Sequence, residues 1–170
     1  IDDNYVTMVV HAAALKQVVS GEANPMEVVA TNIQGTYNVL KASSKCRSTV
    51  VISSDKACYP VNLYGATKMV AEKIAKKFYF INGNVHVVRY GNVAGSRGSV
   101  IPAFKQALAE GKELMITDRE MTRFWITQEK AANLVVNALF SFNSFLSVPT
   151  LPSFKITDLV CALTNTEVFD

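Results

Sequence analysis

The chain has 170 residues, of which 49% are hydrophobic and 18% are charged, and its formal net charge is +3. This composition is typical of a globular protein and excludes a disordered or fibrous chain. The basic residues are scattered along the sequence, so we do not expect nucleic acid as a partner. The three cysteines lie far apart, without a zinc-binding spacing or a disulfide framework, which predicts no metal site and favours a reducing compartment.

Neither the start of the sequence nor its apolar stretches indicate a membrane. The first residues, Ile1–Asn4, show neither the basic start nor the apolar run of a signal peptide. The longest uncharged stretch, residues 131–154, is interrupted by asparagines and prolines, which are costly inside a bilayer. We therefore expect a cytoplasmic protein without a membrane span.

Buried strands alternate with helices in the first part of the sequence. Short apolar runs predict strands at residues 6–10, 49–53 and 84–89. Apolar residues at helical spacing predict helices over residues 24–40, with Pro25 in the first turn, and over 64–80. This alternation with short connections predicts an α/β fold with a parallel sheet, in which ligands bind beyond the carboxyl ends of the strands.

The alternation weakens after residue 95. The sequence predicts a helix at residues 101–110, short strands near 114–116 and 124–126, and a helix at 128–140. We interpret residues 96–170 as a smaller mixed lobe. A helix and a strand within about residues 127–149 are expected to return from it to the parallel sheet.

A phenol and an ammonium group stand four residues apart at the start of the second helix. At this spacing Tyr64 and Lys68 project from one helix face. A phenol is a poor base because its reference pKa is about 10, but a nearby cation favours the phenolate. The pair suits a general acid/base that removes a hydroxyl proton during hydride transfer. The competing interpretation is a chance pair on an amphipathic helix.

The loop before this helix gathers further polar groups. Ser54, Asp55 and Lys56 follow the second strand and bring a hydroxyl, a carboxyl and an amine to the same edge of the sheet. In isolation such a sequence is an ordinary polar turn. We interpret His11 as a hydrogen-bonded structural residue at a strand end, and Trp125 as part of the core of the smaller lobe.

Several blocks of sequence, taken in order, resemble the extended short-chain dehydrogenase/reductases of polysaccharide biosynthesis, specifically the inverting UDP-N-acetylglucosamine 4,6-dehydratases. The resemblance runs from about residue 9 to 163 and rests on residues 10–18, 55–56, 62–68, 89–93, 95–102 and 121–126. It implies an incomplete Rossmann-type fold. Residues 1–95 would form the C-terminal half of an NAD(P)-binding domain, and residues 96–170 part of a substrate-binding lobe.

The resemblance also implies the chemistry of a hydro-lyase. Tyr64, assisted by Ser54 and Lys68, would take the proton of the sugar 4-hydroxyl while C4 is oxidised. Lys56 would then remove the C5 proton while Asp55 protonates the departing 6-hydroxyl. Hydride returned to C6 would leave a 4-keto-6-deoxy amino sugar and restore the cofactor, in the service of surface polysaccharide or glycan biosynthesis.

The same resemblance implies a cofactor, a substrate and the residues that bind them. The cofactor would be a tightly bound and recycled NADP, with NAD as the alternative, and the substrate a UDP-sugar. The implied cofactor contacts are Ala12, Ala13, Lys16, Asn32, Lys68, Tyr90, Asn92 and Val93. The implied nucleotide-sugar contacts are Asn92, Arg97, Ser99, Thr117 and Arg123. Arginine suits a diphosphate because its planar fork donates two hydrogen bonds at once.

The glycine-rich phosphate loop of such domains is absent from the sequence. This predicts either a fragment of a longer protein or an inactive relic, and an open sheet edge favours a homo-oligomer. Two other functions stay open. A nucleotide-sugar 4-epimerase needs Tyr64 and Lys68 but not Asp55 and Lys56, and a non-catalytic binding or scaffold module needs none of them.

Overall fold

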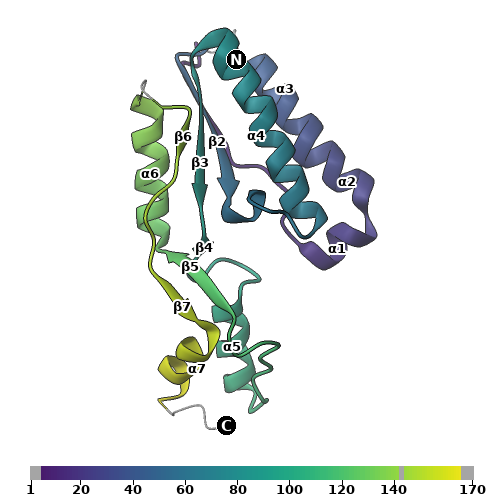
Figure 1. The fold of residues 1–170 in the computed structure, drawn as a ribbon, viewed down its shortest axis with the longest axis vertical. Coiled ribbons are helices and arrows are strands. Elements are labelled where there is room, and N and C mark those ends of the chain that lie inside the picture. The colour runs from purple at the N-terminus through teal and green to yellow at the C-terminus, as the bar shows by residue number, and fades with distance from the viewer. Residues whose placement is uncertain (1–4, 142–143, 166–170) are drawn as a thin grey trace. The chain divides into compact units, whose positions relative to one another are not determined.

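The computed structural model describes residues 5–141 and 144–165. The chain divides into two compact units, Ile1–Tyr90 with Ala132–Pro149 and Gly91–Ala131 with Thr150–Asp170. Each unit contains a sheet of its own and an apolar core of its own (Figure 1).

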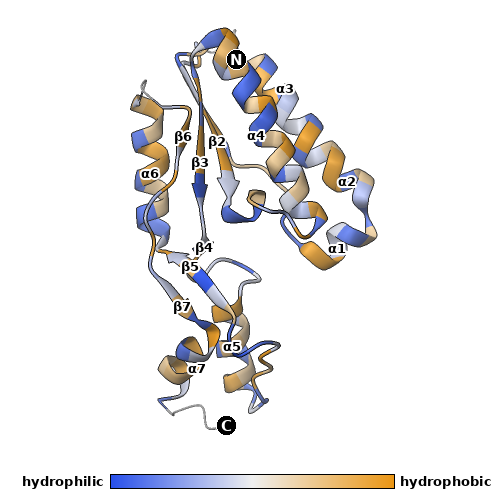
Figure 2. Ribbon diagram, viewed as in Figure 1, coloured by the Kyte–Doolittle hydropathy of each residue, from blue (hydrophilic) through white to orange (hydrophobic). Residues whose placement is uncertain are grey.

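A parallel sheet forms the centre of the first unit. Its strands are β1 (Met8–His11), β2 (Ser48–Ser54), β3 (Val85–Tyr90) and β6 (Leu146–Ser147), and they lie in the order β1-β2-β3-β6. Every neighbouring pair is parallel, which confirms the predicted α/β fold. Figure 2 shows hydrophobic residues in the middle of β2 and β3 and polar residues at their carboxyl ends.

Helix α4 (Leu63–Asn82) begins and ends at clear sequence signals. The Asn62 side chain accepts a hydrogen bond from the Gly65 amide at 2.9 Å, which satisfies one of the free N–H groups of the first turn. Gly83 follows the last turn with a φ of 70°, a backbone conformation that glycine adopts without strain. The predicted helix over residues 64–80 is therefore confirmed.

The helix predicted over residues 24–40 is a run of different helix types. It consists of α2 (Pro25–Val29), a π-helical segment η2 (Ala30–Gln34) and α3 (Gly35–Ala42). A short helix that the sequence did not predict, α1 (Val18–Ala23), precedes it. Its apolar residues are adjacent rather than spaced at helical intervals, so it lacks the pattern that marks the other helices.

Helices cover both faces of the parallel sheet. On one face Leu40 of α3 and Ala75 of α4 pack against Val51, Val85 and Val87. On the other face, residues of α6 (Gln128–Phe140) pack against β2 and β3, and this second cluster contains Val50, Val88, Val135 and Ala138. Because both faces are covered, the strands are β-branched and apolar without alternation.

The second unit has a mixed sheet and two helices. Strand β4 (Asn92–Val93) pairs in parallel with β5 (Thr122–Ile126), and β5 pairs antiparallel with β7 (Ser153–Lys155). Helices α5 (Val100–Ala109) and α7 (Ile156–Thr164) contribute to its core. The buried members of that core are Phe104, Trp125, Ile156, Leu159 and Val160.

The short strand predicted near residues 114–116 is wrong. These residues adopt no regular structure, although Leu114 and Ile116 pack against the core of the second unit. Met115 between them is 84% exposed, so burial alternates as it does in a strand. The alternation arises from a loop lying on the core, since no neighbouring strand pairs with this segment among the described residues.

Candidate active site

The carboxyl ends of β1, β2 and β3 bring together segments that are distant in sequence. Residues 12–16 follow β1, and a single 3-10 turn, η3 (Asp55–Ala57), follows β2. The register pairs Ser53 with Arg89 and Ser54 with Tyr90 at the end of β3. Parallel strands present their ends at one edge, so these residues share it.

Ser54, Asp55 and Lys56 form one hydrogen-bonded cluster. The Ser54 hydroxyl donates to Asp55 Oδ1 at 2.8 Å, and Lys56 Nζ donates to the same oxygen at 3.1 Å. Ser54 Oγ also accepts a hydrogen bond from the Lys56 amide at 3.3 Å, which closes the turn. The side chains of Lys56 and Asp55 are 40% and 29% exposed, so the ion pair stays accessible to a ligand.

The first turn of α4 lies directly against this cluster because residue 65 is a glycine. A Cβ on Gly65 would lie 2.4 Å from the Lys56 carbonyl oxygen and 3.0 Å from Pro60 Cβ. No other residue type fits such a close approach of backbone to backbone. Gly65 therefore holds Tyr64 beside the turn that carries Asp55 and Lys56.

Tyr64 is largely buried beside this cluster. Burial raises the pKa of its phenol, a hydrogen bond with Ser54 lowers it, and the charges of Asp55 and Tyr90 raise it. The net direction of the pKa shift is upward, so the phenol is protonated at neutral pH. Removal of its proton requires a hydrogen-bonding partner and a nearby cation.

Lys68 lies one turn further along α4 and is 7% exposed. Its ammonium group donates a hydrogen bond to the Ile52 carbonyl oxygen at 2.5 Å. Burial lowers the pKa of Lys68 to about 8, while the carboxylate of Glu72 acts in the opposite direction. Lys68 is therefore mainly a cation at neutral pH but close to its titration point.

His11 and Asn32 support the segment after β1. The Nε2 atom of His11 lies 3.0 Å from the Thr36 hydroxyl, and burial, followed by the charge of Lys68, lowers the pKa of His11. This agrees with the structural role expected for His11. Asn32 is 1% exposed, and its side chain bonds to the Leu15 amide at 2.8 Å, the Leu15 carbonyl at 3.0 Å and the Thr67 hydroxyl at 3.0 Å.

The structure thus brings five predicted catalytic residues into one region of the first unit. The predicted cofactor residues Ala12, Ala13 and Lys16 are exposed on the same edge of the sheet, and Asn32 holds the backbone of their segment. Asn32 shapes that segment from inside the protein, since its polar atoms are all engaged there. Tyr90, also predicted to contact the cofactor, ends β3.

The remaining predicted binding residues belong to the second unit. Asn92 and Val93 pair with Trp125 and Ile126 of β5. Arg123 donates a hydrogen bond to the Thr122 carbonyl oxygen at 2.7 Å, and Ser99 precedes the first turn of α5. The other two, Arg97 and Thr117, lie in loops between the elements of this unit.

Sequence reasoning missed Gly65, Glu72 and Arg89 as residues of the site. Glu72 lies two turns after Tyr64 on α4 and binds the side chains of Ser53 and Arg89. The spacing of four residues from Lys68 was the available signal, since it places Glu72 on the same helix face. A charged residue on a long helix is usually solvated, so the signal was weak.

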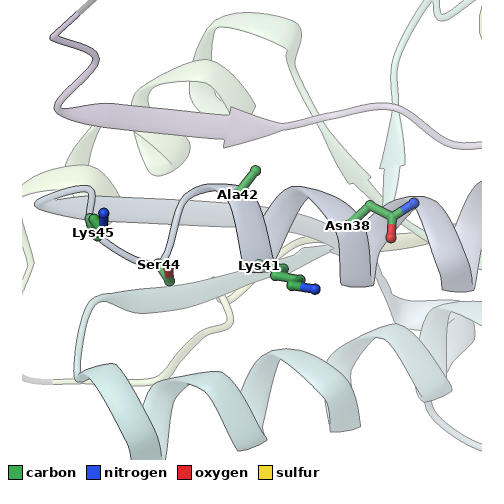
Figure 3. A pocket seen from close by; sticks show the side chains of 5 residues that line it. All are labelled: Asn38, Lys41, Ala42, Ser44 and Lys45. Carbon is green, nitrogen blue, oxygen red and sulfur yellow. The ribbon is translucent and has the colours of Figure 1, made fainter. Parts of the chain in front are cut away.

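A surface hollow of about 400 Å³ lies elsewhere in the first unit, near the end of α3 (Figure 3). It is lined by Asn38, Lys41, Ala42, Ser44 and Lys45, none of which is a predicted site residue. These residues precede β2, so the hollow is remote from the carboxyl ends of the strands. Within residues 5–141 and 144–165, no group of His, Cys, Asp and Glu could hold a metal ion, and no helix is long and apolar enough to cross a membrane.

Comparison with known proteins gives consistent matches over most of the chain. The inverting UDP-N-acetylglucosamine 4,6-dehydratase of Campylobacter jejuni subsp. jejuni serotype O:2 is 48% identical over 93% of this chain and 50% of its own length. The UDP-glucose 4-epimerase of Rickettsia canadensis is 48% identical over 78% of this chain and 41% of its own length. The chain thus spans about half the length of the curated relatives that it matches.

A solved structure shares the fold at lower identity. The dTDP-glucose 4,6-dehydratase DesIV of Streptomyces venezuelae, a double mutant with NAD and DAU bound, superposes with a TM-score of 0.86 at 20% identity, over 96% of this chain and 58% of its own. The family described as "Polysaccharide biosynthesis protein" matches residues 1–169. The chain therefore belongs to this polysaccharide biosynthesis family.

Proposed function

We propose that the protein carrying this chain is a UDP-N-acetylglucosamine 4,6-dehydratase. The observation that supports this most strongly is the cluster of Ser54, Asp55 and Lys56 against the turn that presents Tyr64, with Lys68 one helical turn away. An alcohol oxidation needs the phenol and the ammonium group. An elimination needs the acid and base pair in addition, which is why the cluster favours a dehydratase over an epimerase.

A nicotinamide cofactor, for which we take NADP, fits the exposed edge beside Ala12 and Ala13, because small side chains leave room for a flat ring near the backbone. It would supply a reversible acceptor for the hydride of the sugar. The named solved relative carries NAD, so the choice of NADP is part of the proposal. A homo-oligomer in the cytoplasm, acting on a UDP-sugar, completes it.

In the first step Tyr64 takes the proton of the sugar 4-hydroxyl. Burial raises its own pKa, so the Lys68 cation one helical turn away and the Ser54 hydroxyl must stabilise the phenolate. The ketone formed at C4 acidifies the C5 proton. Lys56 then becomes the base and Asp55 the acid for loss of the 6-hydroxyl as water.

Because Lys56 and Asp55 share a direct hydrogen bond, this elimination step can proceed without a proton from outside the pair. Transfer of one proton from Lys56 Nζ to Asp55 Oδ1, across 3.1 Å, converts the ion pair into an amine and a carboxylic acid. The amine takes the C5 proton, and the acid gives its proton to the departing hydroxyl. The pair returns to its charged form, so no outside proton is consumed.

The test is incubation of the complete protein, loaded with its nicotinamide cofactor, with UDP-N-acetylglucosamine, followed by mass spectrometry. Loss of one water from the sugar supports the proposal. An unchanged mass with an inverted C4 centre identifies a 4-epimerase instead, and a nucleotide sugar that binds without any change identifies a binding module.

The variant Lys56→Met tests the assignment of the elimination base. We expect water loss to fall at least about 100-fold, because no other base replaces the amine, while exchange of the C4 hydrogen with the cofactor continues. Lys41→Met, at the hollow near the end of α3, is the matched control and should retain full activity. Wild-type water loss by Lys56→Met would remove Lys56 from the mechanism.

A further inference from the structure

Glu72 and Arg89, which lie outside the proposed catalytic set, form a partly buried ion pair next to residues of that set. Glu72 of α4 is 9% exposed, and its carboxylate accepts two hydrogen bonds from the Arg89 guanidinium at the end of β3. Ser53 of β2 donates a third hydrogen bond to the same carboxylate at 2.5 Å. The carboxylate therefore joins one helix to the ends of two strands.

The three partners stand immediately beside proposed catalytic positions. Ser53 and Arg89 face each other in the register of β2 and β3, and each is followed by a residue of the site, Ser54 and Tyr90. On α4, Glu72 lies four residues after Lys68, so both side chains project from the same helix face. A shift of Glu72 would move Lys68 relative to the end of β2.

Glu72 also contributes to the electrostatic surroundings of Lys68. Two titratable groups interact electrostatically with Lys68, His11 of β1 and Glu72 of α4. Glu72 binds Arg89 of β3, and Arg89 also interacts with the Cys58 thiol. The Glu72 carboxylate favours the ammonium form of Lys68, whereas burial opposes it. Arg89 offsets part of the Glu72 charge because the two form a bidentate pair.

We propose that Glu72 and Arg89 are positioning residues for the dehydratase reaction, which hold the Tyr64 and Lys68 face of α4 at the ends of β2 and β3. The Glu72 carboxylate is the counter-charge of Lys68, and Arg89 offsets part of it. This inference rests on the proposed function. A buried ion pair with a purely structural role is the alternative. It predicts loss of stability on removal of either partner, with no change in the titration of Lys68.

The two roles differ in the direction of a pH shift. Glu72→Gln removes the anion beside Lys68, so the ammonium form becomes less favourable and the alkaline limb of kcat/KM moves to lower pH by roughly one unit. Arg89→Gln leaves the Glu72 charge without its partner, so the limb moves to higher pH. Glu120→Gln, which removes the exposed ion pair with Lys155 in the second unit, is the matched control and should shift nothing.

The experiment uses the complete protein and combines pH profiles of water loss with ¹⁵N NMR titration of the Lys68 ammonium, assigned with Lys68→Met. Opposite shifts in the two variants support the proposal. Shifts of the same sign, or none in either variant, overturn it. If Glu72→Gln does not fold, Arg89→Gln alone tests the proposal. An alkaline limb of kcat/KM that does not move to higher pH in this variant overturns the proposal.

The NMR titration separates this inference from the proposed function, because it requires no turnover. A wild-type protein that loses no water from UDP-N-acetylglucosamine refutes the dehydratase assignment. If the Lys68 titration still moves in opposite directions in the two variants, the electrostatic link between Glu72, Arg89 and Lys68 is established independently. If it does not move, the link itself is refuted.

Discussion

Lys68 shows, at the scale of a single residue, how a buried charge that is proposed for catalysis weakens the fold that holds it. Its side chain is nearly buried, yet its nitrogen carries a proton at neutral pH. The hydrogen bond to the Ile52 carbonyl and the nearby Glu72 carboxylate offset the lost hydration only in part. The folded protein therefore binds this proton less tightly than the unfolded chain does.

Replacement of Lys68 by Met should stabilise the protein while abolishing activity. The folded state releases the Lys68 proton at a pH of about 8, and the unfolded chain near 10.5, so the charged form weakens folding below pH 8. Met has a similar volume without the charge, and we expect the free energy of unfolding at pH 7 to rise by up to about 3 kcal/mol. Chemical denaturation at several pH values measures this.

The gain in stability should shrink as the pH rises from 8 towards 10.5, because the wild-type ammonium then becomes neutral in the folded state. A gain that is constant with pH would mean that packing, and not charge, is responsible. A loss of stability at pH 7 would mean that the hydrogen bond to Ile52 outweighs the cost of burial.

Single residues were predictable where the chemistry of the side chain is distinctive. Tyr64 and Lys68 stand out because a phenol and an amine share a helix face. Asp55 and Lys56 alone resemble an ordinary polar turn and were singled out by the family resemblance, and the structure places this pair beside Tyr64. Gly65 was not recognised, because its role depends on a carbonyl group nine residues earlier in the chain. Contacts of this kind become visible only in three dimensions.

At the scale of the elements, the contact between the start of α4 and η3 determines the geometry of the site. Gly65→Ala would place a methyl group 2.4 Å from the Lys56 carbonyl oxygen, where neither backbone segment can yield easily. We expect the helix to move away from η3. Activity should then fall at least about 100-fold, since a displacement of about 1 Å is enough for such a loss.

The matched control is Gly35→Ala, at the first residue of α3. A Cβ there lies 3.6 Å from the Ala30 carbonyl oxygen, an ordinary contact, so alanine should be accepted and should stabilise the helix by up to about 1 kcal/mol. Turnover of UDP-N-acetylglucosamine and thermal melting compare the two variants. Full activity in Gly65→Ala would show that the close contact does not position Tyr64.

The elements themselves were predicted unevenly, for physical reasons. Strands β2 and β3 and helix α4 have strong signals, because continuous β-branched runs and long helical periods are rarely ambiguous. Apolar periodicity does not distinguish a π-helical segment such as η2 from the α-helices on either side, so the sequence indicated one continuous helix. Burial alternates along residues 114–116 as it does in a strand, because this loop lies on the core of the second unit. Among the described residues no strand pairs with it.

For the whole molecule, the β1 edge of the parallel sheet is open in the described part of the chain. Strand β1 pairs with β2 on one side, and no strand pairs with its other side among residues 5–141 and 144–165. Val10 on this strand is 43% exposed. Unpaired strand edges with exposed apolar side chains favour association with other chains.

A polypeptide of residues 1–170 alone should therefore self-associate, and Val10→Lys should reduce that association. A lysine on an edge strand opposes pairing because its charge must stay hydrated. Sedimentation velocity over a range of concentrations measures the effect, with the exposed Val136→Lys of α6 as the control for added charge. Equal association of both variants would show that the β1 edge is not responsible.

The five proposed catalytic side chains all come from residues 54–68, a stretch that contains the η3 turn, a short loop and the first turns of α4. Because the proposed catalytic residues lie in one short stretch, substitutions there can change the reaction without changing the rest of the fold. If the proposed elimination holds, altering the adjacent pair Asp55 and Lys56 could leave an epimerase, because Tyr64, Lys68 and Gly65 would stay in place. Changes of this kind leave the rest of the fold intact, and residues 54–68 could be transferred together to a related protein.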